Sequence, residues 1–287
     1  MQIVIIGHTG FIGKNIFENL IQSKEYDIVG LSTNEIDLTK ENSKDVLSNH
    51  LSSDCVIIMC AGLKKQLGDN LITFENNMFI INNFCKAILE VNPQMIIYLS
   101  STSVYGEDVA YLEKISEYTP VQPKTYYGIA KYAAERILEK ICTDNGINLV
   151  ILRPPLVYGK DDLSQGYGPT GFTYKALNNE EIILWGDGSE FREFIYVDDV
   201  GKMVSQIINS NYSGILNLVS GISYTYEEIL TLLRQILGMN IRVVSRERSK
   251  EKVDHHYSSK LIRDLMKDFS FTSIDDGLKK MYKSIAS

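Results

Sequence analysis

A glycine-rich turn directly after a short apolar run constrains the fold of this chain more than any other feature. Residues 3–6 are all aliphatic, and Gly7, Gly10 and Gly13 follow in the pattern G-x-x-G-x-x-G. From residue 11 onward apolar side chains recur at helical spacing, which predicts a strand, a tight turn and a helix. Glycines let such a turn approach a pyrophosphate, and the helix N-terminus offers free N–H groups. The sequence therefore predicts a dinucleotide site here; the alternative is a tight turn without a ligand.

Short apolar runs alternate with helical patterns through the first half of the chain. Further strands are predicted at residues 27–31, 55–60, 95–99 and 148–152, and helices near 73–91 and 127–144. Strands that alternate with helices indicate parallel β-α-β units. Strands that are apolar throughout indicate a sheet covered on both faces. We expect an α/β fold: a Rossmann-type doubly wound parallel sheet with a smaller C-terminal α/β substrate lobe.

The pattern loosens after about residue 155. Helices are predicted near 173–179, 198–209, 225–237 and 273–286, and short strands at 182–184, 193–197, 215–218 and 241–244. We predict that residues 1–155 form the cofactor-binding domain and that residues 156–287 form mainly a substrate-binding lobe interwoven with it. The segment 160–172 is expected to shape the substrate pocket.

Composition and charge argue against several classes of protein. The net charge of −7 argues against a nucleic-acid binder, which would usually show a basic face. No apolar stretch approaches 18 residues, so no membrane span is expected, and the N-terminus does not resemble a signal peptide. Cys55, Cys60, Cys85 and Cys142 form no C-x-x-C pair and no ligand cluster with histidine or aspartate. We expect free thiols in a reducing cytoplasm and no metal site.

A tyrosine and a lysine stand four residues apart in the predicted helix 127–144. Tyr127 and Lys131 therefore share a face of that helix. A nearby cation lowers the pKa of a phenol, which would let Tyr127 take a proton from a sugar hydroxyl during hydride transfer. The hydroxyl-rich residues 100–103 follow the strand 95–99 and would face the ligand crevice beside it. The alternatives are a surface Tyr–Lys pair and a polar turn.

The end of the second predicted strand leaves the form of the cofactor open. An acidic residue there usually binds the adenosine ribose of NAD, whereas an arginine accommodates the phosphate of NADP. This strand ends in Ser32 and Thr33 instead. Their hydroxyls suit either a ribose hydroxyl or a phosphate, so the expected cofactor is NAD or NADP.

Together these motifs resemble the extended short-chain dehydrogenase/reductase family, and within it the NAD-dependent nucleotide-sugar epimerase/dehydratase group. The resemblance runs from Gly7 to about Gly277. The sequence A-G-L-K at 61–64 is similar to that of UDP-galactose 4-epimerases. S-S-x-x-V-Y-G at 100–106 and Y-G-x-x-K at 127–131 resemble the catalytic motifs of the family.

The resemblance implies roles for individual residues. The catalytic residues would be Ser101, with Thr102 as the fallback, together with Tyr127 and Lys131. The cofactor-binding residues would be Gly7, Thr9, Gly10, Phe11, Ile12, Gly13, Ser32, Asp37, Leu38, Cys60, Ala61, Gly62, Lys64, Asn77, Tyr127, Lys131 and Pro154. The substrate-binding residues would be Ser103 and Arg192.

Arg192 opens a block, residues 192–199, that resembles the family's R-D-F-I-x-V-x-D segment. In that segment the arginine usually grips the nucleotide diphosphate, because its guanidinium can meet phosphate oxygens in pairs. The alternative for Arg192 is an ion pair with Asp198 or Asp199.

Departures from the family narrow the expected chemistry. The 4,6-dehydratases carry Thr-Asp-Glu where residues 101–103 are Ser-Thr-Ser, so dehydration is not expected. Epimerases acting at C3 or C5 of the sugar place a cysteine where Ser103 stands and a histidine elsewhere; no histidine lies between His50 and His255. UDP-galactose epimerases usually have asparagine where Leu156 stands and aspartate where Ser32 stands, so the match to that subgroup is partial.

What remains is chemistry that needs only serine, tyrosine, lysine and the nicotinamide. We expect a nucleotide-sugar 4-epimerase that acts through a transient 4-keto sugar. The alternatives are a 4-ketoreductase or dehydrogenase and a non-catalytic dinucleotide-sensing protein. The expected partner is a nucleotide-diphosphate sugar from cytoplasmic polysaccharide biosynthesis. The resemblance also implies a homodimer formed through the helices near 73–91 and 127–144.

Overall fold

The computed structural model describes residues 1–162, 168–248 and 250–286. The chain divides into two compact units. The first unit comprises Met1–Glu107, Pro120–Pro154 and Val200–Asn217. The second comprises Asp108–Thr119, Pro155–Asp199 and Leu218–Ser287. Each unit is therefore assembled from stretches that are separated in the sequence.

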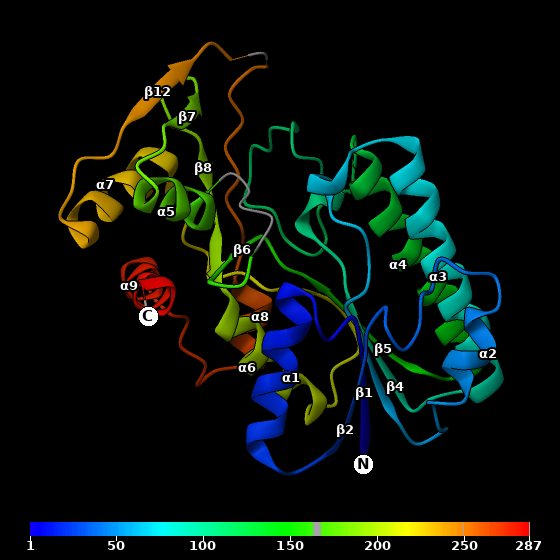
Figure 1. Cartoon of the computed structure of the whole chain (residues 1–287). Helices are drawn as coiled ribbons and strands as arrows, with labels where there is room; N and C mark the ends of the chain where they lie inside the picture. The colour runs from blue at the N-terminus through cyan, green and yellow to red at the C-terminus, as the bar shows by residue number, and fades with distance from the viewer. Residues whose placement is uncertain (163–167, 249, 287) are drawn as a thin grey trace. The chain divides into compact units, whose positions relative to one another are not determined.

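A six-stranded parallel sheet forms the centre of the first unit (Figure 1). Its strands, in spatial order, are β10 (Gly214–Asn217), β5 (Asn148–Arg153), β4 (Met95–Leu99), β3 (Val56–Met59), β1 (Gln2–Ile6) and β2 (Asp27–Leu31). The chain leaves β1 for β2 on one side and returns to β3 on the other, so the winding direction reverses beside β1. Ligands of such sheets bind outside the carboxyl ends of the strands at this reversal.

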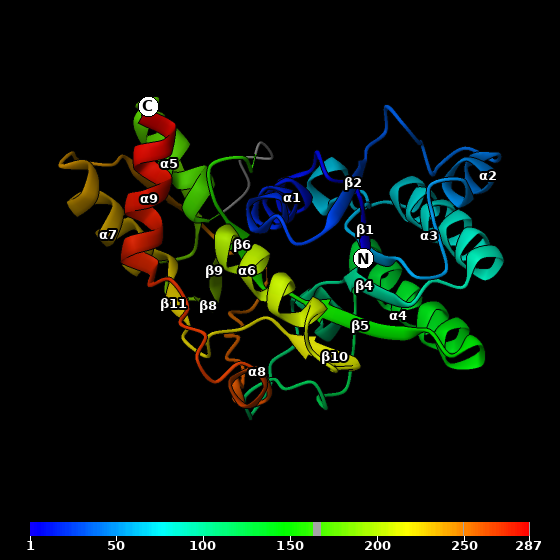
Figure 2. The same cartoon turned by 90° about the horizontal axis from the view of Figure 1, so that it is seen from below.

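Helices cover both faces of this sheet, as the two views show (Figures 1 and 2). One face carries α2 (Ser43–Ser48), α3 (Leu71–Val91) and α4 (Tyr126–Asn145). The other carries α1 (Phe11–Ser23) and the part of α6 (Val197–Ile208) that belongs to this unit. Because both faces are covered, β3 and β4 are buried along their whole length. The predicted Rossmann-type doubly wound sheet is confirmed.

Local sequence explains where the long helices begin and end. Asn70 and Thr73 form a capping box at the start of α3, in which each side chain bonds the backbone of the other residue. Thr125 caps α4 by accepting a hydrogen bond from the Gly128 N–H, and Gly146 ends that helix with a left-handed backbone. These caps fix the first turn of α4, which holds Tyr127.

Among its described residues, the second unit contains three short two-stranded sheets and helices. β6 (Leu156–Tyr158) pairs with β9 (Phe194–Tyr196), β7 (Ile182–Trp185) with β12 (Val243–Arg246), and β8 (Phe191–Arg192) with β11 (Tyr224–Thr225). Its helices are α5 (Pro169–Leu177), α7 (Tyr226–Leu237), α8 (Lys260–Leu265) and α9 (Ile274–Ala286). Aliphatic and aromatic side chains form its core, in which Phe172 and Phe194 pack edge-on against Tyr226.

Two predicted elements differ from the structure. The helix expected at 173–179 begins at Pro169, because proline suits the first turn of a helix, whereas Gly171 disguised the helical pattern. Residues 169–172, expected to belong to a pocket-forming insertion, are thus buried helix; residues 163–167 of that insertion lie outside the described residues. The strand expected at 215–218 is β10, which pairs with β5 in the sheet of the first unit.

Candidate active site

The glycine turn closes tightly at the carboxyl end of β1. Gly7 has a φ of +86°, and a Cβ there would lie 2.9 Å from the Ala61 nitrogen at the end of β3. A Cβ on Gly13 would lie 2.2 Å from the Gly7 carbonyl oxygen. Only glycine therefore lets the first turn of α1 rest against the turn that precedes it.

The N-terminus of α1 is open to an anion. Gly10 is its N-cap, so no side chain caps the helix, and its first turn contains no acidic residue. The first N–H groups of a helix have no partner within it, and together they present a partial positive charge. The residues present therefore fit the pyrophosphate of a dinucleotide. Thr9, Phe11 and Ile12, also predicted to bind the cofactor, belong to this turn and the helix start.

The end of β3 joins the glycine turn to α3. The Asn77 side chain accepts a hydrogen bond from the Leu63 N–H at 2.8 Å and donates one to the Leu63 carbonyl at 3.1 Å. The Lys64 ammonium lies 5.2 Å from the centre of the Phe11 ring at the start of α1. A Cβ on Gly62 would come within 3.4 Å of Asn77 Oδ1. The predicted cofactor residues from Cys60 to Lys64 thus lie between the glycine turn and α3.

Burial keeps the Cys60 thiol neutral, because it raises the pKa of that group to about 12.

Other predicted cofactor residues form hydrogen bonds within or near their own loops. Asp37 accepts hydrogen bonds from the Thr39 N–H at 3.0 Å and the Thr39 hydroxyl at 2.6 Å. The Leu38 carbonyl accepts one from Asn83 at 3.0 Å. The Pro154 carbonyl accepts one from the Thr102 N–H at 3.0 Å. This bond ties the end of β5 to residues 100–107, which follow β4 and are called the catalytic loop below.

The three predicted catalytic side chains come together in the first unit. Ser101 caps the short 3-10 helix η2 (Thr102–Tyr105), its oxygen accepting a hydrogen bond from the Ser103 N–H at 3.1 Å. Its side chain also forms a hydrogen bond with Tyr127, in the first turn of α4. One turn later Lys131 donates to the Leu99 carbonyl at 2.6 Å, and its Nζ lies 5.9 Å from the centre of the Tyr127 ring.

Burial controls the charge states of this triad. It raises the pKa of Tyr127 to about 12, although the hydrogen bond with Ser101 opposes the increase. It lowers the pKa of Lys131 to about 8, against the effects of Cys60 and Glu135. The prediction that the lysine lowers the pKa of the phenol is wrong for this structure, because desolvation outweighs a cation that is bonded to a carbonyl oxygen. The phenol of the protein is therefore protonated at neutral pH.

A chain of hydroxyl groups leads from the triad to a carboxylate. The Ser101 hydroxyl donates to the Ser103 oxygen at 3.1 Å, and the Ser103 hydroxyl donates to Glu107 Oε1 at 3.2 Å. The other carboxylate oxygen of Glu107 pairs with Lys65 in η1 (Lys65–Leu67). Sequence analysis missed Glu107 and Lys65. The available signal was an acidic residue directly after V-Y-G.

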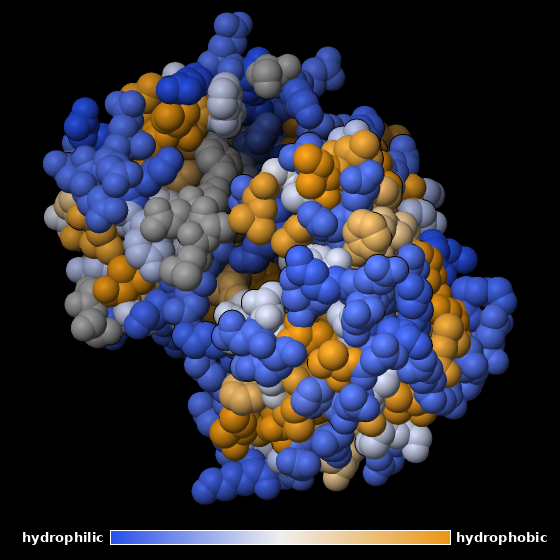
Figure 3. Space-filling view, turned by 45° about the vertical axis from the view of Figure 1, so that its right-hand side comes forward, coloured by the Kyte–Doolittle hydropathy of each residue, from blue (hydrophilic) through white to orange (hydrophobic). Residues whose placement is uncertain are grey.

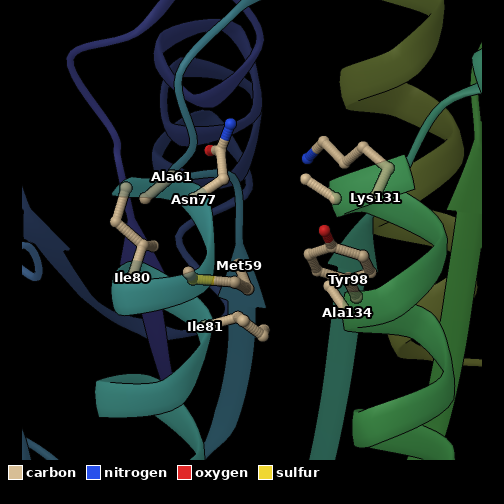
Figure 4. A pocket seen from close by; sticks show the side chains of 9 residues that line it. Met59, Ala61, Asn77, Ile80, Ile81, Tyr98, Lys131 and Ala134 are labelled. Carbon is tan, nitrogen blue, oxygen red and sulfur yellow. The ribbon is translucent and has the colours of Figure 1, made fainter. Parts of the chain in front are cut away.

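A small pocket lies beneath Lys131, between α3 and α4 (Figure 4). The Asn77 and Lys131 side chains extend from its opposite walls, and the Tyr98 hydroxyl lies below Lys131. The cavity measures about 10 Å³, close to the room that one water molecule needs. It is lined by Met59, Ala61, Asn77, Ile80, Ile81, Tyr98, Ala130, Lys131 and Ala134. Its size excludes a sugar or a nucleotide.

Buried charges support the catalytic loop from behind. The Arg153 guanidinium pairs with both oxygens of the Glu135 carboxylate, one turn after Lys131 in α4. Glu135 also accepts a hydrogen bond from the Ser100 hydroxyl, and Arg153 donates one to the Tyr105 oxygen at 2.8 Å. Sequence analysis did not identify Glu135, because a glutamate in a helical pattern usually faces solvent.

The second unit contains a pair of arginines around one carboxylate. Arg192 donates hydrogen bonds to the Phe191 carbonyl at 2.8 Å and the Val253 carbonyl at 2.6 Å, and lies 3.6 Å from Glu190. Arg248 donates to Glu190 and to Asp187, each at 2.7 Å. Sequence analysis missed Arg248, which belongs to no motif. The ion pair of Arg192 is therefore with Glu190 and not with Asp198 or Asp199, the alternative considered from the sequence.

Within the described residues, no group of three or more histidine, cysteine, aspartate or glutamate side chains is arranged to hold a metal ion. Over the same part of the chain, no helix has both the length and the apolar character needed to cross a membrane.

Comparisons with known proteins identify relatives along the whole chain. The model of the "NAD dependent epimerase/dehydratase family" matches residues 3–218. The GDP-6-deoxy-D-talose 4-dehydrogenase of Aggregatibacter actinomycetemcomitans is 26% identical over 99% of this chain and 98% of the relative. The GDP-L-colitose synthase of Yersinia pseudotuberculosis is 25% identical over 83% of this chain and 82% of its own.

Solved structures share the fold. The UDP-glucuronic acid 4-epimerase of Bacillus cereus, in complex with UDP-glucuronic acid and NAD, superposes with a TM-score of 0.86. The two sequences are 20% identical, and the superposition covers 100% of this chain and 99% of the epimerase chain. The UDP-glucose 4-epimerase of Thermotoga maritima, solved with UDP-glucose, has a TM-score of 0.86 at 23% identity, over 99% of this chain and 98% of its own.

Proposed function

Because this chain belongs to the NAD dependent epimerase/dehydratase family, we propose that it is a nucleotide-sugar 4-epimerase that acts through a transient 4-keto sugar. Family membership makes it an NAD-dependent enzyme, so the non-catalytic alternative is not retained. The observation that carries the proposal is the assembly of Ser101, Tyr127 and Lys131 beside the residues that lie between the glycine turn and α3. The identity of the sugar and the 4-epimerase activity are the proposed part.

The side chains divide the proton chemistry among them. NAD held by the glycine turn and the residues after β3 would supply the acceptor, and then the donor, of the hydride at C4 of the sugar. The Tyr127 phenol, which is protonated at neutral pH, first loses its own proton to solvent. As the phenolate it then accepts the proton of the 4-hydroxyl and gives it back, as a positioned acid/base would. Ser101 forms a hydrogen bond with the 4-oxygen of the sugar while the proton leaves that oxygen. Lys131, whose Nζ lies 5.9 Å from the centre of the Tyr127 ring, would hold the bound cofactor beside the phenol.

The hydroxyl side chains of η2 support epimerisation over dehydration. Elimination of water requires an acid and a base beside the hydroxyl that leaves. Thr102 and Ser103 stand in the two positions where a dehydratase carries acidic residues, and neither can ionise at neutral pH. We propose that Ser103 contacts the sugar instead.

The paired arginines of the second unit support a nucleotide diphosphate as the activating group. Two guanidinium groups meet at the Glu190 carboxylate, and Arg248 also pairs with Asp187. Each guanidinium fork matches the oxygens of a phosphate. We propose that Arg192 and Arg248 bind the diphosphate and that Glu190 holds both side chains in its absence.

A second candidate function is a nucleotide-sugar 4-ketoreductase or dehydrogenase. A relative named as a 4-dehydrogenase aligns with 99% of this chain. The hydroxyl chain from Ser101 to Glu107 also favours it, because net oxidation must pass one proton per turnover from Tyr127 to solvent. An epimerase returns that proton to the sugar and needs no such exit. In Glu107→Gln, impaired net oxidation would favour the dehydrogenase, whereas unchanged isomerisation would favour the epimerase.

The test begins with the purified protein. It is denatured, and released small molecules are identified by mass spectrometry. UDP-, GDP-, CDP- and dTDP-sugars are then incubated with the protein and followed by proton NMR. Stoichiometric NAD and interconversion of two 4-epimers would support the proposal. Conversion of a sugar only in the presence of added NADH or NAD, in step with cofactor consumption, would replace it with the second candidate.

We further propose a homodimer that forms through α3 and α4. Both helices expose apolar side chains, among them Ile72 and Phe79 on α3 and Ile129 on α4, which are 69%, 55% and 40% exposed. Apolar groups also reach the surface in the space-filling view that brings this side of Figure 1 forward (Figure 3). Phe79→Glu should convert the dimer to a monomer in light scattering, whereas a wild-type monomer would contradict the proposal.

All four cysteines are free thiols, which agrees with the proposed reducing cytoplasm.

A further inference from the structure

An acidic side chain reaches the end of β2 although the sequence provides none there. Ser32 follows β2 directly, and its N–H and hydroxyl both donate to Glu35 Oε2, at 2.7 and 2.5 Å. The Ser32 carbonyl accepts hydrogen bonds from the Glu35 and Ile36 N–H groups, at 3.2 and 2.8 Å. The turn therefore folds the Glu35 carboxylate back onto the strand end. Glu35 Oε1 takes part in neither of the bonds with Ser32.

This carboxylate lies next to the glycine turn. The Leu31 carbonyl at the end of β2 accepts hydrogen bonds from the Gly7 and His8 N–H groups, at 2.7 and 3.4 Å. In folds of this kind, the pyrophosphate sits on the glycine turn and the adenosine ribose sits over the end of the second strand. The position of Glu35 is thus the position from which a carboxylate meets the ribose 2′ oxygen.

The neighbouring groups keep the carboxylate ionised and in place. Hydrogen bonds from Ser32 hold the pKa of Glu35 below its ordinary value, and His8 contributes in the same direction. Ser32 is 5% exposed, whereas Glu35 is exposed, so a buried residue anchors an acid at the surface. The His8 ring fills the space above Gly30, where a Cβ would lie 2.6 Å from its Cγ.

The segment after β2 has no arginine that could bind a 2′-phosphate. The chain contains no arginine before Arg136. Lys40, which follows this loop, lies 3.8 Å from Asp37. A 2′-phosphate carries nearly two negative charges at neutral pH, and a fixed carboxylate beside it would repel them. A 2′-hydroxyl would instead donate a charge-assisted hydrogen bond to the same oxygen.

We propose that Glu35, anchored by Ser32, is the residue that makes this protein select NAD over NADP. The acid that usually ends the second strand is thus supplied from three residues further along the chain. The proposal rests on the dinucleotide site of the family and not on the proposed sugar reaction. It would stand even if the sugar chemistry proved to be that of a dehydrogenase.

The test measures cofactor binding without any sugar. Dissociation constants for NAD⁺ and NADP⁺ are determined by titration calorimetry after bound nucleotide has been removed. The wild type is compared with Glu35→Gln and Ser32→Ala. Glu75→Gln, which removes the same charge from an exposed position on α3, is the matched control. Thermal melting confirms that each variant is folded.

The wild type should bind NAD⁺ more tightly than NADP⁺. Glu35→Gln should reduce that preference on the order of tenfold to hundredfold, which is the effect of one hydrogen bond to a charged group. Ser32→Ala should reduce it in the same direction, because the carboxylate loses its anchor. A preference that is the same in Glu35→Gln and Glu75→Gln would overturn the proposal, as would a wild type that prefers NADP⁺.

Discussion

Arg153 and Glu135 form a two-pronged ion pair in the interior of the first unit, with N–O distances of 2.9 and 2.6 Å and each side chain 2% exposed. The pair joins β5 to α4 one turn below Lys131. Its further hydrogen bonds to Ser100 and Tyr105 fasten both ends of the catalytic loop. The position of Ser101 therefore depends on a buried ion pair behind the loop.

Removing one partner of this pair should destabilise the protein strongly. Glu135→Gln leaves a buried guanidinium without its counter-charge, and we expect a loss of about 3–5 kcal/mol in the free energy of unfolding. Urea denaturation followed by circular dichroism measures the loss. Glu139→Gln is the matched control, because Glu139 pairs with Arg136 at the surface of the same helix and such pairs contribute less than about 1 kcal/mol. Equal losses in the two variants would show that the buried pair has no special role.

Removal of the Tyr127 hydroxyl should stop catalysis without loss of cofactor binding. Tyr127→Phe keeps the ring in its buried place but removes the group that moves the proton, so turnover should fall on the order of 10²–10⁴-fold. Steady-state assays with the identified sugar measure the effect, and calorimetry checks that NAD⁺ still binds. Tyr126→Phe, at the exposed neighbouring position, should retain full activity. Near-normal turnover in Tyr127→Phe would remove this residue from the mechanism.

Stability should depend on pH through Lys131. The pKa of this group is about 8 in the folded protein and near 10.5 when unfolded, so the unfolded chain binds more protons between these values. Stability from Lys131 must therefore increase as pH rises from 8 to 10.5, by roughly 3 kcal/mol in total. The contribution of Tyr127 to stability decreases as pH rises above 10, because its pKa is raised to about 12 in the folded protein.

The measurement compares urea unfolding at pH 7.5, 8.5 and 9.5 for the wild type and Lys131→Met. The difference in unfolding free energy between them should shift in favour of the wild type as pH rises. Lys140→Met, which removes an exposed lysine from the same helix, should show no such trend. A difference that stays constant with pH in Lys131→Met would mean that Lys131 keeps its ordinary pKa.

The sequence was sufficient for the parts of this protein that depend on local pattern. The alternation of apolar strands and helices predicted the sheet, and the spacing of Tyr127 and Lys131 placed both on one face of α4. The sequence was not sufficient to predict contacts that depend on the folded backbone, or pKa values that depend on burial. Glu107 reaches Ser103 only because η2 curls the backbone, and burial reverses the expected shift in the pKa of Tyr127.

The acid at the end of β2 shows the same limit. A search for an acidic residue directly after the strand stops at Ser32, because a linear pattern does not include the side chain that folds back from Glu35. In the second unit, Arg248 belongs to no motif, and only the fold brings it to the carboxylate that Arg192 also approaches.

The two arginines should act together on the nucleotide part of the substrate. Arg192→Ala and Arg248→Ala each remove a guanidinium that pairs with Glu190, and each should weaken binding of UDP or GDP by about tenfold or more, the effect of one lost hydrogen bond to a charged group. Lysine at either position should restore only part of the affinity, because an ammonium cannot meet two phosphate oxygens with a planar fork. Arg234→Ala, an exposed residue of α7 that pairs with Glu227, is the matched control. Calorimetric titration with the free nucleotide diphosphate measures the effect. If the affinity is the same in all three alanine variants, the cluster is a structural ion pair and the diphosphate binds elsewhere.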